Sequence, residues 1–183
     1  MKILFFSTSI FVFMLLEFFI GTAGIYLPFC WMSFFYFSAA EYPRKVIIPG
    51  AFIAALLMDL ILYRRIFLPD VVLCGFVIYM TLRYRGFWRV SIWHGGFAGL
   101  VIIITGYFIQ YACSYIYYRY PLRELLQPAA MMVFLLPFGY MLEAGIIFVL
   151  EKLQKKLRLE VPFISVRNDS VLNICRKNYV RGR

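Results

Sequence analysis

Three carboxylates interrupt otherwise apolar stretches of this 183-residue chain, at Glu17, Asp59 and Glu143. A charged side chain near the centre of a bilayer costs about 2.5–3.5 kcal/mol on insertion scales, so such acids usually face a partner, a polar cavity or a pathway. Acids at different depths would suit a proton or cation pathway, but Ser, Thr and Asn are sparse in the apolar runs. The sequence instead favours a structural ion pair for Asp59, with Arg64, Arg65 or an arginine of another outer loop as its partner.

Asp59 stands at the end of a row of small residues. Ala51, Ala55 and Asp59 are spaced four apart, and they therefore share one face of a helix. Small residues let helix backbones approach closely, so this face is predicted to pack against a neighbouring helix. Gly95 and Gly99 repeat the same spacing further along the chain and predict a second close contact between helices.

A third row consists of tyrosines. Tyr107, Tyr111 and Tyr115 are four residues apart, and Gln110 lies beside them in the sequence. Ordinary packing and anchoring at the membrane interface, where Tyr is enriched, account for such a row. The functional alternative is a docking face for a transmembrane helix of a partner protein.

Residue types that carry catalysis or bind metals are scattered along the chain. The four cysteines form no C-x-x-C pair and have no zinc-like spacing, and His94 is the only histidine. The sequence contains no Rossmann, P-loop or zinc motif. We therefore expect no catalytic residue, no cofactor and no metal ion, and we expect that the protein is not an enzyme.

The elements that position these residues are membrane helices. Hydrophobic residues make up 63% of the chain, charged residues only 15%, and the mean hydropathy is +0.81, which excludes an ordinary soluble domain. The apolar runs predict an all-α integral membrane protein with about six transmembrane helices. These runs are 3–21, 26–40, 46–62, 66–82, 95–117 and 129–150. A six-helix transmembrane domain is thus expected over 1–151, followed by a short basic cytoplasmic tail over 152–183.

Lys and Arg are unevenly distributed among the loops. With the N-terminus in the cytoplasm, fifteen of the 19 fall on the inner side and four on the outer side. Because short segments rich in Lys and Arg resist translocation, this bias predicts that both termini are cytoplasmic. The same rule accounts for the net charge of +10, so we infer no nucleic-acid partner. The basic tail, with Leu150, Leu153 and Leu157 at helical spacing, is expected to contact membrane lipids.

Residues 28–83 combine several of these features. A proline opens a short second helix, a brief basic loop with the sequence YPRK follows at 42–45, and the small-residue helix ends in its aspartate just before a fourth helix. In these features the chain resembles the family of the rod-shape-determining protein MreD. Its length, its expected number of spans and its basic cytoplasmic end are also similar to those of the family.

That resemblance implies a non-enzymatic scaffold of the bacterial cell-elongation complex in the cytoplasmic (inner) membrane. Such a protein would bind MreC and help to link MreB filaments to RodA and a class B penicillin-binding protein, and so influence cell shape and peptidoglycan synthesis. The family is similar in fold to the substrate-binding S components of energy-coupling-factor vitamin transporters. The alternative function is that of such an S component, which would carry an A-x-x-x-A motif in its first helix. The first helix of this chain is rich in Phe and lacks that motif.

Overall fold

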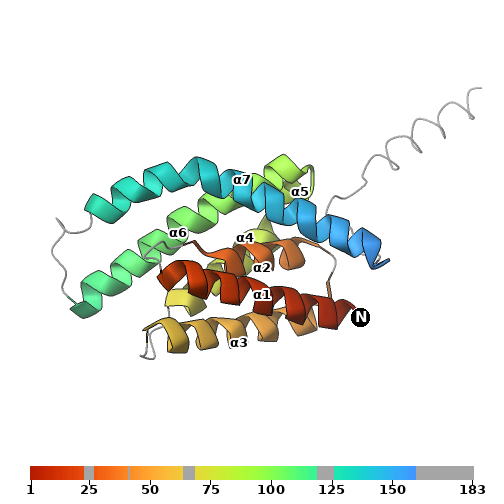
Figure 1. Ribbon diagram of the computed structural model, residues 1–183, viewed down its shortest axis with the longest axis horizontal. Coiled ribbons are helices and arrows are strands. Elements are labelled where there is room, and N and C mark those ends of the chain that lie inside the picture. Colours follow the sequence, from red (N-terminus) through yellow and green to blue (C-terminus); the bar gives the residue numbers. More distant parts are fainter. Residues whose placement is uncertain (23–26, 41, 64–68, 119–125, 160–183) are drawn as a thin grey trace, which may run out of the picture.

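The computed structural model describes residues 1–22, 27–40, 42–63, 69–118 and 126–159, and over these ranges the regular structure is entirely helical (Figure 1). Six of the helices have eleven residues or more, and a single-turn helix lies between two of them. Their bounds are α1 Lys2–Thr22, α2 Phe29–Ala39, α3 Arg44–Tyr63, α4 Pro69–Arg83, α5 Arg85–Trp88, α6 Ile92–Tyr118 and α7 Leu126–Lys156. The prediction of an all-α fold is confirmed.

Three of these helices are long and apolar enough to cross a membrane. The candidate spans cover Lys2–Gly21, Ile92–Cys113 and Val133–Lys156, within α1, α6 and α7. The second predicted span contains only the 11 residues of α2, which extend about 16 Å, whereas the hydrocarbon core of a bilayer is about 30 Å thick. The helices therefore fit a membrane protein, but α2 is too short to cross a bilayer by itself.

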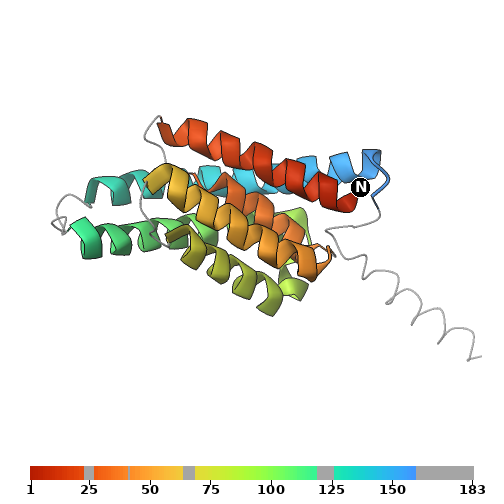
Figure 2. The same ribbon diagram turned by 90° about the horizontal axis from the view of Figure 1, so that it is seen from below.

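The central position in the bundle belongs to α2. All of its residues are buried, and the helix contacts α1, α3, α4, α6 and α7 (Figures 1 and 2). Its aromatic rings pair edge-to-face with neighbouring rings, and the ring centroids of Phe37 and Phe6 lie 5.1 Å apart. Each such pair adds about 0.5–1.5 kcal/mol to the burial of the rings themselves. A helix that is apolar on all sides is expected to be buried in this way.

In α3, small and large residues lie on opposite sides. Ala51 and Ala55 are fully buried, and Asp59 is only 2% exposed. Large apolar residues occupy the exposed side of the same helix, and they are Phe52, Ile53, Leu56, Leu57 and Leu60. The small-residue row therefore faces the protein, where it permits close packing, and the large side chains face outward.

Glycines line the contact between α6 and α7. A Cβ atom placed on Gly99 would come within 2.6 Å of Glu143 Cβ and 2.7 Å of the Gly139 carbonyl oxygen. A Cβ on Gly139 would in turn collide with the Ile103 side chain. The absence of a side chain at these positions lets the two backbones approach closely. Gly99 belongs to the glycine pair whose spacing predicts a close contact, and its neighbour in that contact is α7.

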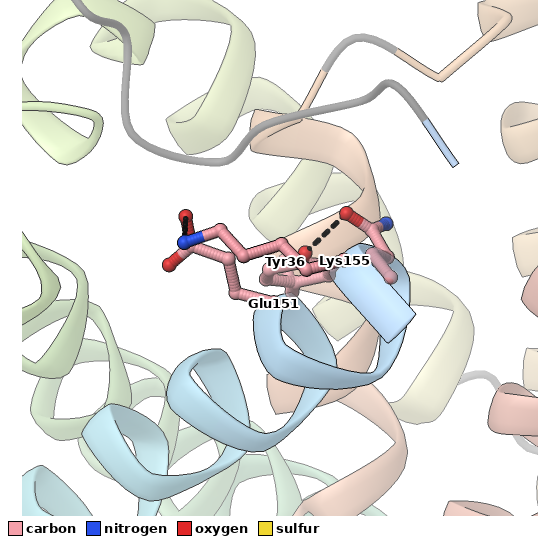
Figure 3. A network of polar contacts seen from close by, with 4 residues as sticks. Tyr36, Glu151 and Lys155 are labelled. Atoms are coloured by element: carbon pink, nitrogen blue, oxygen red, sulfur yellow. Dashed lines mark hydrogen bonds and ion pairs between the residues drawn. The ribbon is translucent and has the colours of Figure 1, made fainter. Parts of the chain in front are cut away.

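A polar network ties the end of α7 to α2 (Figure 3), and a further hydrogen bond ties it to the loop that follows α2. The Tyr36 hydroxyl donates a hydrogen bond to Gln154 Oε1 at 2.8 Å, and Gln154 Nε2 donates one to the Tyr42 hydroxyl at 2.6 Å. Gln154 is only 2% exposed. Beside it, Lys155 forms an ion pair with Glu151 at 3.6 Å. The hydrogen bonds of Gln154 therefore hold the end of α7 against α2 and Tyr42.

The final turns of α7 pass through the expected domain boundary at residue 151, and the helix ends at Lys156. Leu150 is buried, whereas Leu153 and Leu157 are exposed and face outward, where lipid contact is expected. The buried side of this segment carries Gln154 instead. Residues 160–183 of the predicted basic tail lie outside the described residues.

Replacing Gln154 by Leu is expected to destabilise the fold, because the hydroxyls of Tyr36 and Tyr42 both lose it as a hydrogen-bond partner. An unsatisfied buried polar group costs about 1–3 kcal/mol, so the unfolding temperature in detergent should fall by several degrees. Circular dichroism during heating measures this change. Lys152→Gln, which alters an exposed residue of the same helix, is the control and should unfold at the temperature of the parent chain. An unfolding temperature for Gln154→Leu equal to that of the parent chain would contradict the proposed role of the network.

Tyr42 makes the same contact sensitive to alkaline pH. Burial raises the pKa of Tyr42 from 10.0 to about 12, although the hydrogen bond with Gln154 partly offsets this increase. Folding raises the pKa of Tyr42, so the protonated hydroxyl favours the folded state at alkaline pH. Its contribution to the free energy of unfolding is complete below about pH 10 and is lost as the pH rises through about 12. Each unit of pKa difference corresponds to about 1.4 kcal/mol. The free energy of unfolding should therefore fall less over this pH range in Tyr42→Phe than in the parent chain, and identical falls would exclude a contribution from Tyr42.

Candidate functional site

Glu17 caps a helix other than its own. Helix α2 begins directly after Pro28, whose side chain makes no capping hydrogen bond. The first amides of a helix lack acceptors within the helix, and an unsatisfied amide is costly in an apolar interior. Glu17 Oε2 reaches across from α1 and accepts a hydrogen bond from the Cys30 amide at 2.8 Å. Glu17, which is 3% exposed, therefore supplies the cap that the local sequence lacks.

Asp59 makes the corresponding contact at the start of α4. Pro69 occupies the first position of that helix, where the missing amide is tolerated. The next two amides, those of Asp70 and Val71, donate to Asp59 Oδ1 and Oδ2 at 3.2 and 3.4 Å. Asp59 thus joins the end of α3 to the start of α4 and serves two amides at a helix end.

Asp70 brings the two capped helix starts together. Its Oδ1 accepts a hydrogen bond from Trp31 Nε1 of α2 at 3.0 Å. Its backbone amide donates to Asp59, and Trp31 directly follows Cys30, whose amide Glu17 caps. Glu17, Asp59 and Asp70 are all buried, and we refer to these three residues as the acidic cluster.

The charge of the acidic cluster is partly offset by the helices that it caps. A helix N-terminus carries a partial positive charge of about half a unit, and the starts of α2 and α4 both point at these carboxylates. Glu17 Oε1 and Asp70 Oδ2 have no hydrogen-bond partner among the described residues. Arg64 and Arg65, the predicted partners of Asp59, lie outside the described residues. Their ion pair with Asp59 stays a prediction.

The sequence pattern singles out Glu17 and Asp59 but not Asp70. Asp70 follows Pro69 directly, and a proline with an acid in the first turn marks the start of a helix. The apolar run at 66–82 includes both residues, so hydropathy alone does not indicate that a helix starts there. The proline followed by an acid within this run is the sequence feature that identifies Asp70.

Glu143 lies apart from the acidic cluster, in the contact between α6 and α7. The residue is fully buried, and neither carboxylate oxygen has a hydrogen-bond partner among the described residues. Gly99 leaves the space that the Glu143 side chain occupies. The three acids that stand out in the sequence therefore occupy two separate places in the bundle.

The geometry of the acidic cluster suits a structural role. Within the described part of the chain, no group of three or more His, Cys, Asp or Glu side chains is arranged to hold a metal ion. The carboxylates instead present acceptors to backbone donors and to the Trp31 indole. This arrangement holds the starts of two short helices inside an apolar bundle, where water cannot satisfy them.

The tyrosine row lies on the α6–α7 hairpin, whose joined ends extend beyond α1–α4 in both views (Figures 1 and 2). Tyr107 and Tyr111 are partly buried, whereas Tyr115 is 52% exposed. Phe108 on α6 and Phe134 on α7 are also exposed. The hairpin therefore presents Phe108, Tyr115 and Phe134 to its surroundings, whereas Tyr107 packs against the core.

Comparison of the chain with protein-family models, with curated proteins and with solved structures found no match. The resemblance to the MreD family thus rests on the sequence features of residues 28–83. The function is accordingly inferred from the residues and their geometry.

Proposed function

We propose that this protein is a non-enzymatic membrane scaffold of the bacterial cell-elongation complex, which binds MreC and influences cell shape and peptidoglycan synthesis. The observation that carries this proposal is the α6–α7 hairpin, which extends past the other helices and exposes aromatic side chains. Exposed aromatic side chains on one side of a helix, such as Phe108 and Tyr115 on α6, suit the docking of another helix. Through MreC, the protein would act on MreB, RodA and a class B penicillin-binding protein.

The acidic cluster supports a structural use of the buried carboxylates. Glu17 and Asp59 both accept hydrogen bonds from backbone amides at helix starts. A carboxylate engaged in this way holds two helices in a fixed relation to each other. That role fits a scaffold better than it fits a proton or cation pathway, which needs polar groups that the permeant ion can reach.

The proposed topology has about six crossings of the cytoplasmic membrane, one of them made inside the bundle by the run 26–40 that contains the short α2, and both termini in the cytoplasm. Contacts between helix ends support it, since the end of α1 meets the start of α2 and the end of α3 meets the start of α4. The end of α2 meets the end of α7 through Gln154. Consecutive helices that meet end to start run in opposite directions, which suits an even number of crossings. The distribution of Lys and Arg gives the direction of these crossings.

Reporter fusions test this topology. A reporter fused after Arg183 is expected to be active only in the cytoplasm, because the basic tail resists translocation. A reporter inserted between Arg64 and Asp70 is expected to be active only outside the cytoplasm. Enzymatic reporters that function on one side of the membrane measure both positions, and the opposite pattern would contradict the proposed orientation.

A photo-crosslinking amino acid at position 115 tests the docking face directly. In native membranes it is expected to capture a single-span protein with a periplasmic coiled coil, which is the form expected of MreC. The matched control is position 53 on α3, because Ile53 is 58% exposed and Tyr115 52%. Equal capture at the two positions, or no capture at position 115, would contradict the docking proposal. Co-purification of two ATPases with a coupling subunit would instead identify an S component of a vitamin transporter.

A further inference from the structure

A groove opens where α4 ends and α6 begins, beside the single-turn helix α5. Its volume of about 490 Å³ lies within the range of about 300–1,000 Å³ that is typical of small-molecule sites. Apolar and aromatic side chains form its walls, and they include Tyr79, Met80, Tyr84, Phe87, Trp88 and Val101. None of these residues belongs to the acidic cluster or to the tyrosine row.

Interlocked aromatic rings give the groove a fixed shape. Trp88 is buried, and its Nε1 donates a hydrogen bond to the Met80 carbonyl oxygen at 3.3 Å. Its ring packs edge-to-face against Phe35 of the central helix α2 at 5.6 Å and against Phe87 at 4.9 Å, measured between ring centroids. The groove is therefore formed before any ligand enters it, as is usual for binding sites.

Three arginines belong to the stretch of chain that forms the groove. Arg83 is exposed and follows Tyr79 and Met80 by four and three residues, so it shares their face of α4. Arg85 and Arg89 follow within the same junction between α4 and α6. Basic pockets between transmembrane helices are suited to the head groups of anionic lipids.

We propose that this groove binds an anionic phospholipid, with an acyl chain against the aromatic walls and the phosphate group at Arg83. The acyl chain matches the apolar lining, and the Arg83 guanidinium can form two parallel hydrogen bonds to one phosphate. Phe87 also lines a second groove of about 290 Å³, together with Trp93 and Phe97. A phospholipid with two chains would place one chain on each side of Phe87.

Fluorescence quenching by brominated lipids tests this site in the full chain. In a Trp93→Phe background, Trp88 lines the groove, whereas Trp31 is fully buried beside Asp70 at the opposite end of α4, so quenching by lipid reports on Trp88. The protein is reconstituted in phosphatidylcholine vesicles that contain increasing amounts of brominated phosphatidylglycerol or of brominated phosphatidylcholine. Half-maximal quenching is expected at about fivefold less of the anionic lipid, which is the effect of one basic residue near a lipid charge.

Two variants and one control assign the site. In Arg83→Gln, half-maximal quenching should require about the same amount of either lipid. The control Lys152→Gln removes an exposed charge on α7 and should leave the preference for the anionic lipid unchanged. Val101→Phe should fill the groove and weaken quenching by both lipids. Arg83→Gln alters an exposed residue, so its result does not depend on whether Val101→Phe folds.

Equal quenching by the two lipids in the parent chain would overturn the proposal, and so would an undiminished preference in Arg83→Gln. The proposal would also be overturned if neither lipid quenched Trp88 and size-exclusion chromatography showed a dimer. That result would assign the groove to a second copy of the chain. None of these outcomes depends on the binding of MreC, so the lipid site and the scaffold function fail or hold separately.

Discussion

Gly99→Leu is expected to prevent α6 and α7 from packing and to leave little folded protein. Even the first added carbon would lie 2.6 Å from Glu143 Cβ and 2.7 Å from the Gly139 carbonyl oxygen, and a backbone carbonyl cannot rotate away. Overpacking a core typically costs about 1–3 kcal/mol, and Leu adds four carbons here, so we expect a loss of at least about 3 kcal/mol. Size-exclusion chromatography in detergent and thermal unfolding measure the effect.

Gly75 and Gly145 supply matched controls, because a Cβ atom at either position would have no heavy atom of a neighbouring element within 4 Å. Gly to Ala inside an exposed helix gains up to about 1 kcal/mol. Gly75→Ala and Gly145→Ala should therefore unfold at the same temperature as the parent chain or slightly above it. Gly99→Ala should unfold at a lower temperature. If all three alanine variants behaved alike, the close approach of α6 and α7 would be wrong.

Asp59→Leu is expected to produce the second large loss of stability. Leu is similar in size to Asp but offers no acceptor to the amides of Asp70 and Val71. Each unsatisfied buried donor costs about 1–3 kcal/mol, so the two together should cost about 2–6 kcal/mol. The free energy of unfolding in detergent, or the unfolding temperature where unfolding is irreversible, measures this loss.

Asp59→Asn separates a helix cap from an ion pair. Asn keeps one oxygen acceptor, which serves one of the two amides, and carries no charge, so it should lose clearly less stability than Leu if Asp59 acts as a cap. If Asp59 acts chiefly through Arg64 or Arg65, Asn should fail as badly as Leu. Asp59→Glu keeps the charge and should be partly tolerated. Parent-like stability of Asp59→Leu would exclude both the cap and the ion pair.

The helical class of this fold could be predicted from the sequence, but the depth of each helix could not. Hydropathy scores an apolar residue in the same way whether lipid or protein surrounds it, so residues 26–40 predict a span like the others. In the structure this run forms the short α2 at the centre of the bundle. Its central position depends on five neighbouring helices, whose arrangement comes from contacts between residues far apart in the chain.

The candidate site could be predicted only in part. Glu17 and Asp59 can be found in the sequence because an acid in an apolar run has a high free-energy cost in a membrane. Their partners could not be predicted, because each acid accepts a hydrogen bond from a backbone amide, and every residue except proline has one. Gln154 could not be predicted as a buried residue. The helical spacing of Leu153 and Leu157 suggests that the leucines face the protein, but Gln154 is buried and the two leucines are exposed. In a membrane the polar side of a helix can face the protein, so a pattern of leucines does not identify the core.

The caps described for α2 and α4 bear on how the chain assembles in a membrane. In the usual two-stage scheme, each helix is stable in lipid before helices associate, but a helix whose first amides are unsatisfied is not stable alone. Glu17 precedes the Cys30 amide by 13 residues, and Asp59 precedes the Asp70 amide by 11. Each acceptor is therefore synthesised before the donor that it serves. During synthesis, each of these helix starts therefore follows an acceptor that is already part of the chain.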